Sequence, residues 1–321
     1  MPLQPKDAID AAGRTGDIVV LGSSVMDVIG RPLTALHPRS SAPGVVRLSP
    51  GGVARNVAEN LARLGVDVAL ITAVGDDPPG RQLLEQAEAA GVDVRHALSV
   101  SGERTGMYLG VLDPQGGLHV ALDDMGVVRR LSPDFLRTKT TVLEQARAIF
   151  FDANLAPDSL ELVIAIGRRA GIPVAADPTS ASLAANLRPH LKDLWLITPN
   201  AAEAEILCPH AVPHADRDSA LDAARHLVSE GVEIALVTMA EFGVGYASAE
   251  TSGHVPAVKT VIIDPTGAGD AQTAAVLFGL LNGIPLDESV RLGASAAALT
   301  LRTHGSVVPD LSLERLYDEL R

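Results

Sequence analysis

The chain has very little cysteine and lysine, and each shortage excludes a class of chemistry. Cys208 is the only cysteine among 321 residues, so an internal disulfide is impossible, which fits a reducing cytosol. Lysine occurs at four positions, none of which follows a glycine in a Walker-type loop: Lys6, Lys139, Lys192 and Lys259. Backbone amides and a metal ion, rather than a P-loop lysine, would therefore have to hold any phosphate.

Basic charge and long apolar runs are also scarce. The chain has 26 Lys and Arg against 39 Asp and Glu, and its net charge of −13 argues against binding to nucleic acid or to a membrane surface. No apolar run reaches transmembrane length, and residues 1–16 lack the hydrophobic core of a signal peptide. The sequence therefore predicts a soluble cytoplasmic protein, with a flexible segment over residues 1–16 and one folded domain over residues 17–321.

The most informative stretch is Asp264–Asp270, which reads DPTGAGD. It lies between an apolar run, Val261–Ile263, and an Ala/Leu-rich pattern that is typical of a helix. Gly267 and Gly269 allow a tight turn that leaves backbone N–H groups pointing into one concavity. Because these amides also lie at a helix start, where the helix dipole favours negative charge, we expect an anion-binding site here.

Asp270 falls in the first turn of this expected helix. A carboxylate beside an anion-binding site suits acid–base catalysis next to developing negative charge, as in phosphoryl transfer. The residues alone also allow a plainer interpretation, a glycine-rich turn in which Asp270 only stabilises the helix start. Both interpretations stay open at this point.

Two motifs resemble those of a known family. Asp264–Asp270 resembles one signature of the ribokinase-like (PfkB) carbohydrate kinases, and Gly51–Asn56, which reads GGVARN, resembles their N-terminal di-glycine signature. The order and separation of the two motifs match the family, and the resemblance extends from about Asp17 to the end of the chain. It implies an ATP- and Mg²⁺-dependent kinase with a small-molecule substrate; relatives often hold K⁺ as well.

The resemblance also assigns roles to residues of the active site. Asp270 would be the catalytic base, and three backbone amides would hold the transferring phosphoryl group: Gly267, Ala268 and Gly269. Five residues would bind the substrate: Asp27, Gly51, Gly52, Asn56 and Asn154. From the residues alone, Asp27 could equally be a loop acid in the turn after the strand Asp17–Gly22, and Asn56 a surface amide.

Later segments would hold the nucleotide and its cation. By resemblance, the nucleotide contacts are Asn200, Thr238, Gly243, Gly267, Gly269 and Ala294, and the Mg²⁺ or K⁺ contacts are Asn200, Glu203 and Asp264. The pattern of Asn200 and Glu203 also predicts a helix N-cap with a capping glutamate, which is compatible with a metal role because the cap fixes the carboxylate. Ala240 stands where the family has glycine, so the nucleotide loop departs from the family pattern there.

The middle of the chain repeats one pattern, an apolar run that ends in a polar residue and is followed by a helix. The runs are Ala148–Phe151, Ile172–Ala176, Leu194–Ile197 and Ile234–Val237. This repeat predicts an α/β fold with a doubly wound, mainly parallel sheet flanked by helices. By similarity to the family, about 31–50 and 104–124 form a small β-sheet lid, hinged at Gly51–Gly52, whose apolar face pairs in a homodimer.

Within the family, several phrases resemble pseudouridine kinases: Gly51–Gly65, Thr105–Tyr108, Asp152–Leu155 and Asp177–Ser180. One departure is that residues 182–186 lack the lysine that pseudouridine kinases often carry there. The hypothesis is phosphorylation of the 5′-hydroxyl of pseudouridine. The alternatives are a kinase for ribose, adenosine or inosine, and a non-catalytic ligand-binding protein on the same fold. A dinucleotide-dependent oxidoreductase is disfavoured, because no Gly-x-Gly-x-x-Gly follows the first strand.

Overall fold

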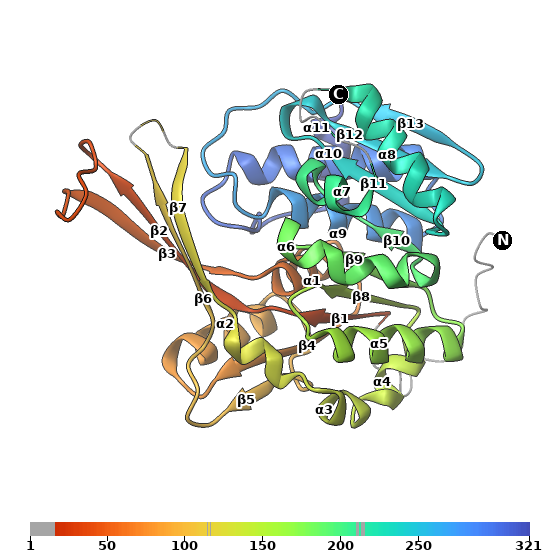
Figure 1. Cartoon of the computed structure of the whole chain (residues 1–321), viewed down its shortest axis with the longest axis horizontal. Coiled ribbons are helices and arrows are strands. Elements are labelled where there is room, and N and C mark those ends of the chain that lie inside the picture. Colours follow the sequence, from red (N-terminus) through yellow and green to blue (C-terminus); the bar gives the residue numbers. More distant parts are fainter. Residues whose placement is uncertain (1–16, 114, 116, 210–211, 213–215) are drawn as a thin grey trace.

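The computed structural model describes residues 17–113, 115, 117–209, 212 and 216–321. These residues form two β-sheets, a large one within the body of the molecule and a small one that projects from it (Figure 1). The segment 1–16, predicted to be flexible, lies outside the described residues. Within the described part, no helix combines the length and the apolar character needed to cross a membrane.

The large sheet has nine strands in the order β13-β12-β11-β10-β9-β8-β1-β4-β5. The neighbours from β11 to β5 are parallel, and β12 and β13 extend one edge with antiparallel pairs. The strands are β1 (Ile18–Gly22), β4 (Val68–Gly75), β5 (Leu98–Val100), β8 (Ala148–Asp152), β9 (Val174–Asp177), β10 (Leu196–Ile197), β11 (Ile234–Thr238), β12 (Val244–Ser248) and β13 (Ser252–Val255). The predicted mainly parallel sheet is confirmed.

Helices cover both faces of the large sheet, because its strands are apolar on both sides. Along β1, Val19 and Leu21 pack into one helical layer and Ile18 and Val20 into the other. The first layer contains α3 (Pro133–Arg137), α4 (Thr140–Gln145), α5 (Pro157–Ala170), α6 (Ala181–Ala184), α7 (Ala201–Leu207) and α8 (Arg217–Ser229). The second contains α1 (Val53–Arg63), α2 (Pro78–Ala89), α9 (Ala268–Leu281), α10 (Leu286–Leu301) and α11 (Leu313–Glu319). Three 3₁₀ turns also occur: η1 (Gly126–Arg130), η2 (Ala185–Asp193) and η3 (Ala240–Phe242).

The small sheet has four strands in the order β3-β2-β6-β7. They are β2 (Val25–Pro32), β3 (Gly44–Gly51), β6 (Met107–Leu112) and β7 (Leu118–Asp124), with β2 and β6 parallel and the outer pairs antiparallel. Of the two interpretations of Asp27 that the residues left open, the loop acid is wrong. Asp27 lies inside β2, because pairing with both β3 and β6 satisfies the backbone of this segment from Val25 or Met26 onward.

The two faces of the small sheet differ in character. The strand register places six exposed apolar side chains on one face: Val46, Leu48, Met107, Leu109, Val120 and Leu122. Asp27 lies on the opposite face, because side chains alternate along a strand. A second exposed apolar segment is Val261–Ile263, which belongs to no strand and joins the body through a hydrogen bond from the Ile263 amide to the Leu301 carbonyl.

Candidate active site

Helix α9 begins in the turn that the sequence predicts as an anion-binding site. Gly267 is its N-cap, and the φ of 78° at this residue is a left-handed conformation that glycine adopts without strain. A side chain at this position would also collide with the backbone of Ser306. The first amides of a helix have no acceptor within the helix, so the N–H groups of Ala268 and Gly269 are oriented toward an incoming anion.

Asp270 lies in the first turn of α9. Its Oδ2 accepts a hydrogen bond of 2.7 Å from Asn56 Nδ2. Burial raises the pKa of Asp270 to about 6; the Asn56 bond opposes this rise, the Asp152 carboxylate adds to it and Arg55 lowers it. A carboxyl group with this pKa is ionised at neutral pH and is still basic enough to accept a proton.

The orientation of the Asn56 amide is fixed by its other contacts. Asn56 is buried in the first turn of α1, and its Oδ1 accepts bonds from Arg55 Nη1 at 3.1 Å and from Ser306 Oγ at 2.9 Å. A guanidinium group can only donate, so the amide oxygen must face Arg55 and the amide NH₂ must face Asp270. The Asn56–Asp270 bond thereby joins the starts of α1 and α9.

Sequence reasoning assigned no role to Arg55. Its side chain is buried and forms an ion pair with Glu59, which in turn pairs with Arg63 at 2.6 Å. Burial lowers the pKa of Arg55 and the Glu59 carboxylate raises it. The sequence did contain a sign of this pairing. Arg55, Glu59 and Arg63 alternate in charge at four-residue spacing, which on a helix brings opposite charges together on one face.

Asp27 approaches the same cluster from the small sheet. Its side chain is buried, and burial, followed by the Asp270 carboxylate, raises the pKa of Asp27 to about 7, while Arg55 lowers it. Gly51 leaves room for this carboxylate, because a Cβ there would overlap it. Gly52 has a φ of 94° and packs closely on the Ser23 backbone. The two glycines of the motif therefore serve close packing around Asp27 and α1.

Asp152, at the end of β8, anchors this arrangement. Its Oδ2 accepts bonds from Ser23 N at 2.8 Å, Ser23 Oγ at 2.7 Å and Ala54 N at 3.0 Å. Its Oδ1 accepts a bond of 3.0 Å from the amide of Asn154, whose side-chain Nδ2 lies 3.4 Å from Ser23 Oγ. Asp152 thus holds the start of α1 and positions Asn56, a role that the apolar-run pattern alone did not reveal.

The start of α7 forms the predicted capping box. Asn200 Oδ1 accepts a bond of 3.0 Å from the Glu203 amide, and Glu203 Oε2 accepts one of 2.9 Å from the Asn200 amide. Glu203 Oε1 also accepts a bond of 2.7 Å from Asn200 Nδ2. Burial raises the pKa of Glu203 and these bonds lower it. Thr238, at the end of β11, lies beside Asn200 through a parallel bridge between their backbones.

The carboxylates near Glu203 fit a divalent cation. Burial, followed by the carboxylates of Glu203 and Asp270, raises the pKa of Asp177 well above its ordinary value. Oxygen donors that repel each other suit Mg²⁺, whose charge would relieve the repulsion. Among the described residues, no three His, Cys, Asp or Glu side chains are grouped closely enough to hold a metal. A Mg²⁺ ion beside Glu203 would therefore have to take most of its ligands from water and phosphate.

Three residues that the sequence analysis singled out lie in the loops around the site: Asp264, Gly243 and Ala240. Asp264 accepts bonds from the amides of Thr266 at 3.0 Å and Gly305 at 3.4 Å, so it ties the α9 turn to the loop after α10. Gly243 has a φ of 92° and packs against the backbone of β13. Ala240 has a φ of 46°, so a left-handed conformation occurs at the position where the resemblance led us to expect glycine.

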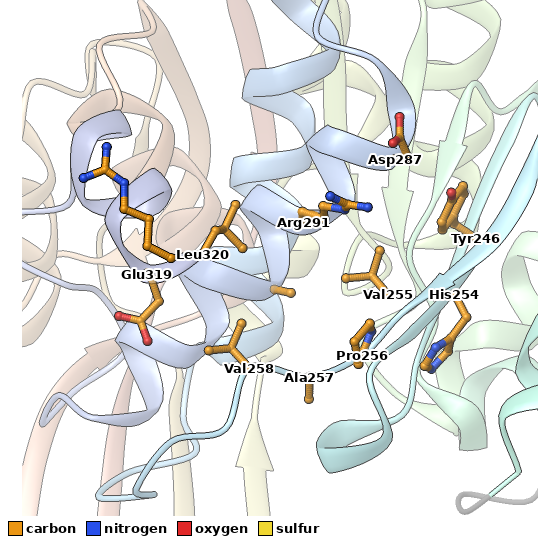
Figure 2. A pocket seen from close by; sticks show the side chains of 12 residues that line it. Tyr246, His254, Val255, Pro256, Ala257, Val258, Asp287, Arg291, Glu319 and Leu320 are labelled. Carbon is orange, nitrogen blue, oxygen red and sulfur yellow. The ribbon is translucent and has the colours of Figure 1, made fainter.

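A cavity of about 450 Å³ lies between the β12–β13 edge, α10 and the end of α11 (Figure 2). Ala294, predicted to contact the nucleotide, lines this cavity together with the segment Val255–Val258. Asp270, Asn56 and Asp27 do not line it. The structure therefore brings the predicted base and substrate residues together, while Ala294 belongs to a separate hollow on the same helical layer.

The fold and the site together define the class, an α/β phosphotransferase of the ribokinase-like fold that acts on an alcohol group. The chain belongs to the pfkB family of carbohydrate kinases, whose family model matches residues 15–312.

Individual relatives agree with this assignment. Pseudouridine kinase from Escherichia coli (strain K12) is 34% identical over 298 residues, which cover 92% of this chain and 94% of that protein. Guanosine-inosine kinase from Exiguobacterium acetylicum is 30% identical, covering 92% and 97%. The structure of Arabidopsis thaliana ribokinase complexed with ribose and ATP matches with a TM-score of 0.81 at 20% identity, covering 96% and 99%. The predicted family and fold are confirmed.

Proposed function

We propose that this chain is an ATP-dependent kinase that phosphorylates the 5′-hydroxyl of a nucleoside, with pseudouridine as the substrate. The observation that supports it most directly is the environment of Asp270, which lies beside the amides at the start of α9. The pKa of its carboxyl group is raised to about 6, and its Oδ2 accepts a hydrogen bond from Asn56. The similarity to the Escherichia coli pseudouridine kinase along 92% of this chain supports the choice of nucleoside.

The substrate ribose would lie between the small sheet and the body. Asp27 would accept hydrogen bonds from the ribose hydroxyls, and Asn56 would donate the second hydrogen of its Nδ2 to one of them at the start of α1. Gly51 and Gly52 would contact the sugar through their backbone groups, which their close packing on Asp27 and Ser23 holds in place. Asn154 would contact the substrate from the end of β8, where its link to Ser23 holds it in place.

Phosphoryl transfer would use Asp270 as the base. As the 5′-oxygen forms its bond to the γ-phosphorus, its proton passes to Asp270 Oδ1 or Oδ2, and the electron pair of the breaking bond leaves on ADP. The amides of Gly267, Ala268 and Gly269 would stabilise the negative charge on the transferring group. Asn56 would hold the Asp270 carboxylate in place for this step through its bond to Oδ2.

The nucleotide would extend from the α9 turn along the neighbouring loops. Asn200, Thr238 and Gly243 would contact its phosphates and ribose, and Ala294 with the cavity in Figure 2 would take the adenine. Glu203, with Asn200, would orient the waters of a bound Mg²⁺, and Asp264 would support a second cation site. Mg²⁺, when bound, would neutralise charge on the β- and γ-phosphates.

The small sheet would act as the lid over the substrate and as a dimer interface. Its six exposed apolar side chains form a continuous face of the kind that marks protein–protein contacts. A second copy of the chain would cover this face, while the Asp27 face closes on the substrate. Closure would exclude water and limit hydrolysis of ATP.

One substrate panel tests the proposal. ADP release is measured with Mg-ATP and, in turn, pseudouridine, uridine, adenosine, inosine, ribose and fructose 6-phosphate. The expected result is a kcat/KM for pseudouridine at least tenfold above that for every other acceptor. Preference for inosine would favour the activity named for the guanosine-inosine kinase relative. Preference for adenosine would favour an adenosine kinase, and preference for ribose a pentose kinase. Nucleoside binding by calorimetry without ADP release would instead indicate a non-catalytic binding protein.

A further inference from the structure

A row of polar side chains crosses the small sheet on the face opposite its exposed apolar side chains. The strand register pairs Asp27 of β2 with Ser49 of β3 and with Tyr108 of β6, and Tyr108 with Asp123 of β7. Directly paired residues of neighbouring strands project to the same face of a sheet. Ser49, Asp27, Tyr108 and Asp123 therefore form one line, perpendicular to the strands.

This line lies on the substrate side of the sheet. Asp27 interacts electrostatically with Asp270, Arg55 and Asp264, which all belong to the body of the molecule. Tyr108 is half-buried, and burial together with Asp27 and Asp123 raises its pKa. Its hydroxyl is therefore protonated at neutral pH and can act as a donor, and it has no hydrogen-bond partner within the part of the chain that the structure describes.

The length of the line exceeds what a pentose needs. Neighbouring strands lie about 4.8 Å apart, so Tyr108 stands about 5 Å and Asp123 about 10 Å from Asp27 along the line. A ribose ring held by Asp27 fills the first part of this distance. A heterocycle attached to the ribose would extend from there toward Tyr108 and Asp123.

We propose that Tyr108 and Asp123 recognise the base of the nucleoside, with the Tyr108 ring packing against the heterocycle and the Asp123 carboxylate accepting a hydrogen bond from a ring N–H. This inference rests on the proposed nucleoside kinase function and adds to it a class of base, one with an N–H donor on the edge remote from the sugar. Tyr108 and Asp123 act in substrate selection and take no part in the proton transfer to Asp270.

The neighbouring acid supplies a matched comparison. Asp123 is exposed, and no hydrogen bond or ion pair to it is found within the described residues. Asp124 is also exposed, pairs with Met107 on the opposite face of the sheet, and accepts a bond of 3.3 Å from the Gly126 amide. The two acids therefore share charge, strand and exposure but differ in the face that they occupy.

The experiment compares Asp123→Asn, Tyr108→Ala and Asp124→Asn with the unmodified chain. Asp123→Asn should raise the KM for the preferred nucleoside about tenfold, because losing one hydrogen bond to a charged acceptor weakens binding by about that factor. The kcat and the KM for ATP should stay unchanged. Tyr108→Ala should raise the KM for the nucleoside by a similar factor through lost packing. Binding of ribose alone, measured by calorimetry, should stay within twofold in both variants. Asp124→Asn should leave every parameter within twofold, and all three variants should melt within a few degrees of the unmodified chain.

Two outcomes separate this inference from the proposed function. If the unmodified chain turns over no nucleoside, both fail together. If it does, and Asp123→Asn either matches it or weakens ribose and nucleoside equally, base recognition by this row is wrong and the kinase assignment stands.

Discussion

Asn56 Nδ2 lies 2.7 Å from Asp270 Oδ2, although the two residues are separated by more than 200 positions in the chain. The bond joins the di-glycine motif to the glycine-rich turn, because each residue lies in the first turn of the helix that follows its motif. Two signatures that are far apart in the sequence thus meet through one amide and one carboxylate.

The first prediction concerns the base itself. Asp270→Asn should lower kcat by about 10²- to 10⁴-fold, since the amide cannot accept the substrate proton. Binding of Mg-ATP, measured by calorimetry, should stay within a few-fold because the amides of the α9 turn are retained. A kcat within tenfold of the unmodified chain would contradict the assignment of Asp270 as the base.

The same variant should not lose stability. Folding raises the pKa of Asp270 from its ordinary 3.8 to about 6, so the folded chain binds this proton more tightly than the unfolded chain. Stability from this group therefore falls as pH rises from about 4 through about 6, and the ionised carboxylate is unfavourable at neutral pH. Replacing it with a neutral amide removes that penalty, so the melting temperature at pH 7 should be equal or a few degrees higher.

The pH profile supplies the second prediction. Asp270 and Asp27 have raised pKa values of about 6 and about 7, and both carboxylates must be ionised for proton transfer and for hydroxyl binding. The two groups interact, so kcat/KM should rise with pH through this range as a pair of macroscopic steps and then level off. The measurement is kcat/KM at saturating Mg-ATP from about pH 5 to about pH 9. A profile that is already flat at about pH 5 would show ordinary carboxyl groups and would overturn the proposed environment of the site.

Arg55 gives the third prediction. Arg55→Met removes the donor that fixes the Asn56 amide and the positive charge that lowers the pKa of Asp270 and of Asp27. The acid side of the kcat/KM profile should therefore move to higher pH, and kcat should fall about tenfold. The fold should persist because Glu59 retains its ion pair with Arg63.

The conservative variant distinguishes positioning from packing. Arg55→Lys restores the charge without the planar guanidinium, so the pH profile should return toward that of the unmodified chain while kcat recovers only in part. If Arg55→Met lowers the melting temperature but leaves the pH profile in place, Arg55 has only a structural role.

Much of the fold and part of the site could be predicted from the sequence, because their signals are local. Apolar runs such as Ala148–Phe151 are buried on both faces, and their alternation with helices favours a parallel, helix-covered sheet. The capping box of Asn200 and Glu203 was predicted from three-residue spacing and is present. The turn before Asp270 needed only two glycines and a following helix to be located.

What the sequence did not show depends on contacts between distant segments. Asp27 joins a strand because β3 and β6 pair with β2 from both sides, and β6 comes only after β3, α1, β4, α2 and β5 in the chain. Asp152 holds the start of α1 through Ser23 and Ala54, about a hundred or more residues away. The buried position of Arg55 likewise follows from the packing of α1 against α9 and the Ser306 loop, which no local pattern contains.

The apolar face of the small sheet leads to the fourth prediction. If a second copy covers this face, a charge at its centre should separate the copies, because an unpaired buried carboxylate costs several kcal/mol. Leu48→Glu with Leu122→Glu should therefore shift the chain from dimer to monomer in sedimentation equilibrium. Val45→Glu is the matched control, since Val45 is exposed on the same strand β3 but on the opposite face. A monomeric unmodified chain, or equal dissociation by both changes, would exclude this interface.

The last prediction concerns Ala240, whose φ of 46° places an L-residue in the left-handed region. This conformation costs an alanine about 1–2 kcal/mol, and glycine adopts it freely, although glycine loses up to about 1 kcal/mol more backbone entropy on folding. Ala240→Gly should therefore stabilise the chain by up to about 1 kcal/mol and raise its melting temperature by about 2–4 °C. Ala249→Gly is the control, because Ala249 is exposed in a nearby bend without a positive φ, and there the same substitution should lower the melting temperature. Calorimetric melts of the two variants decide the matter. A loss of stability in both would show that the loop at Ala240 carries no strain, while opposite signs would show that the chain tolerates a strained alanine at this position.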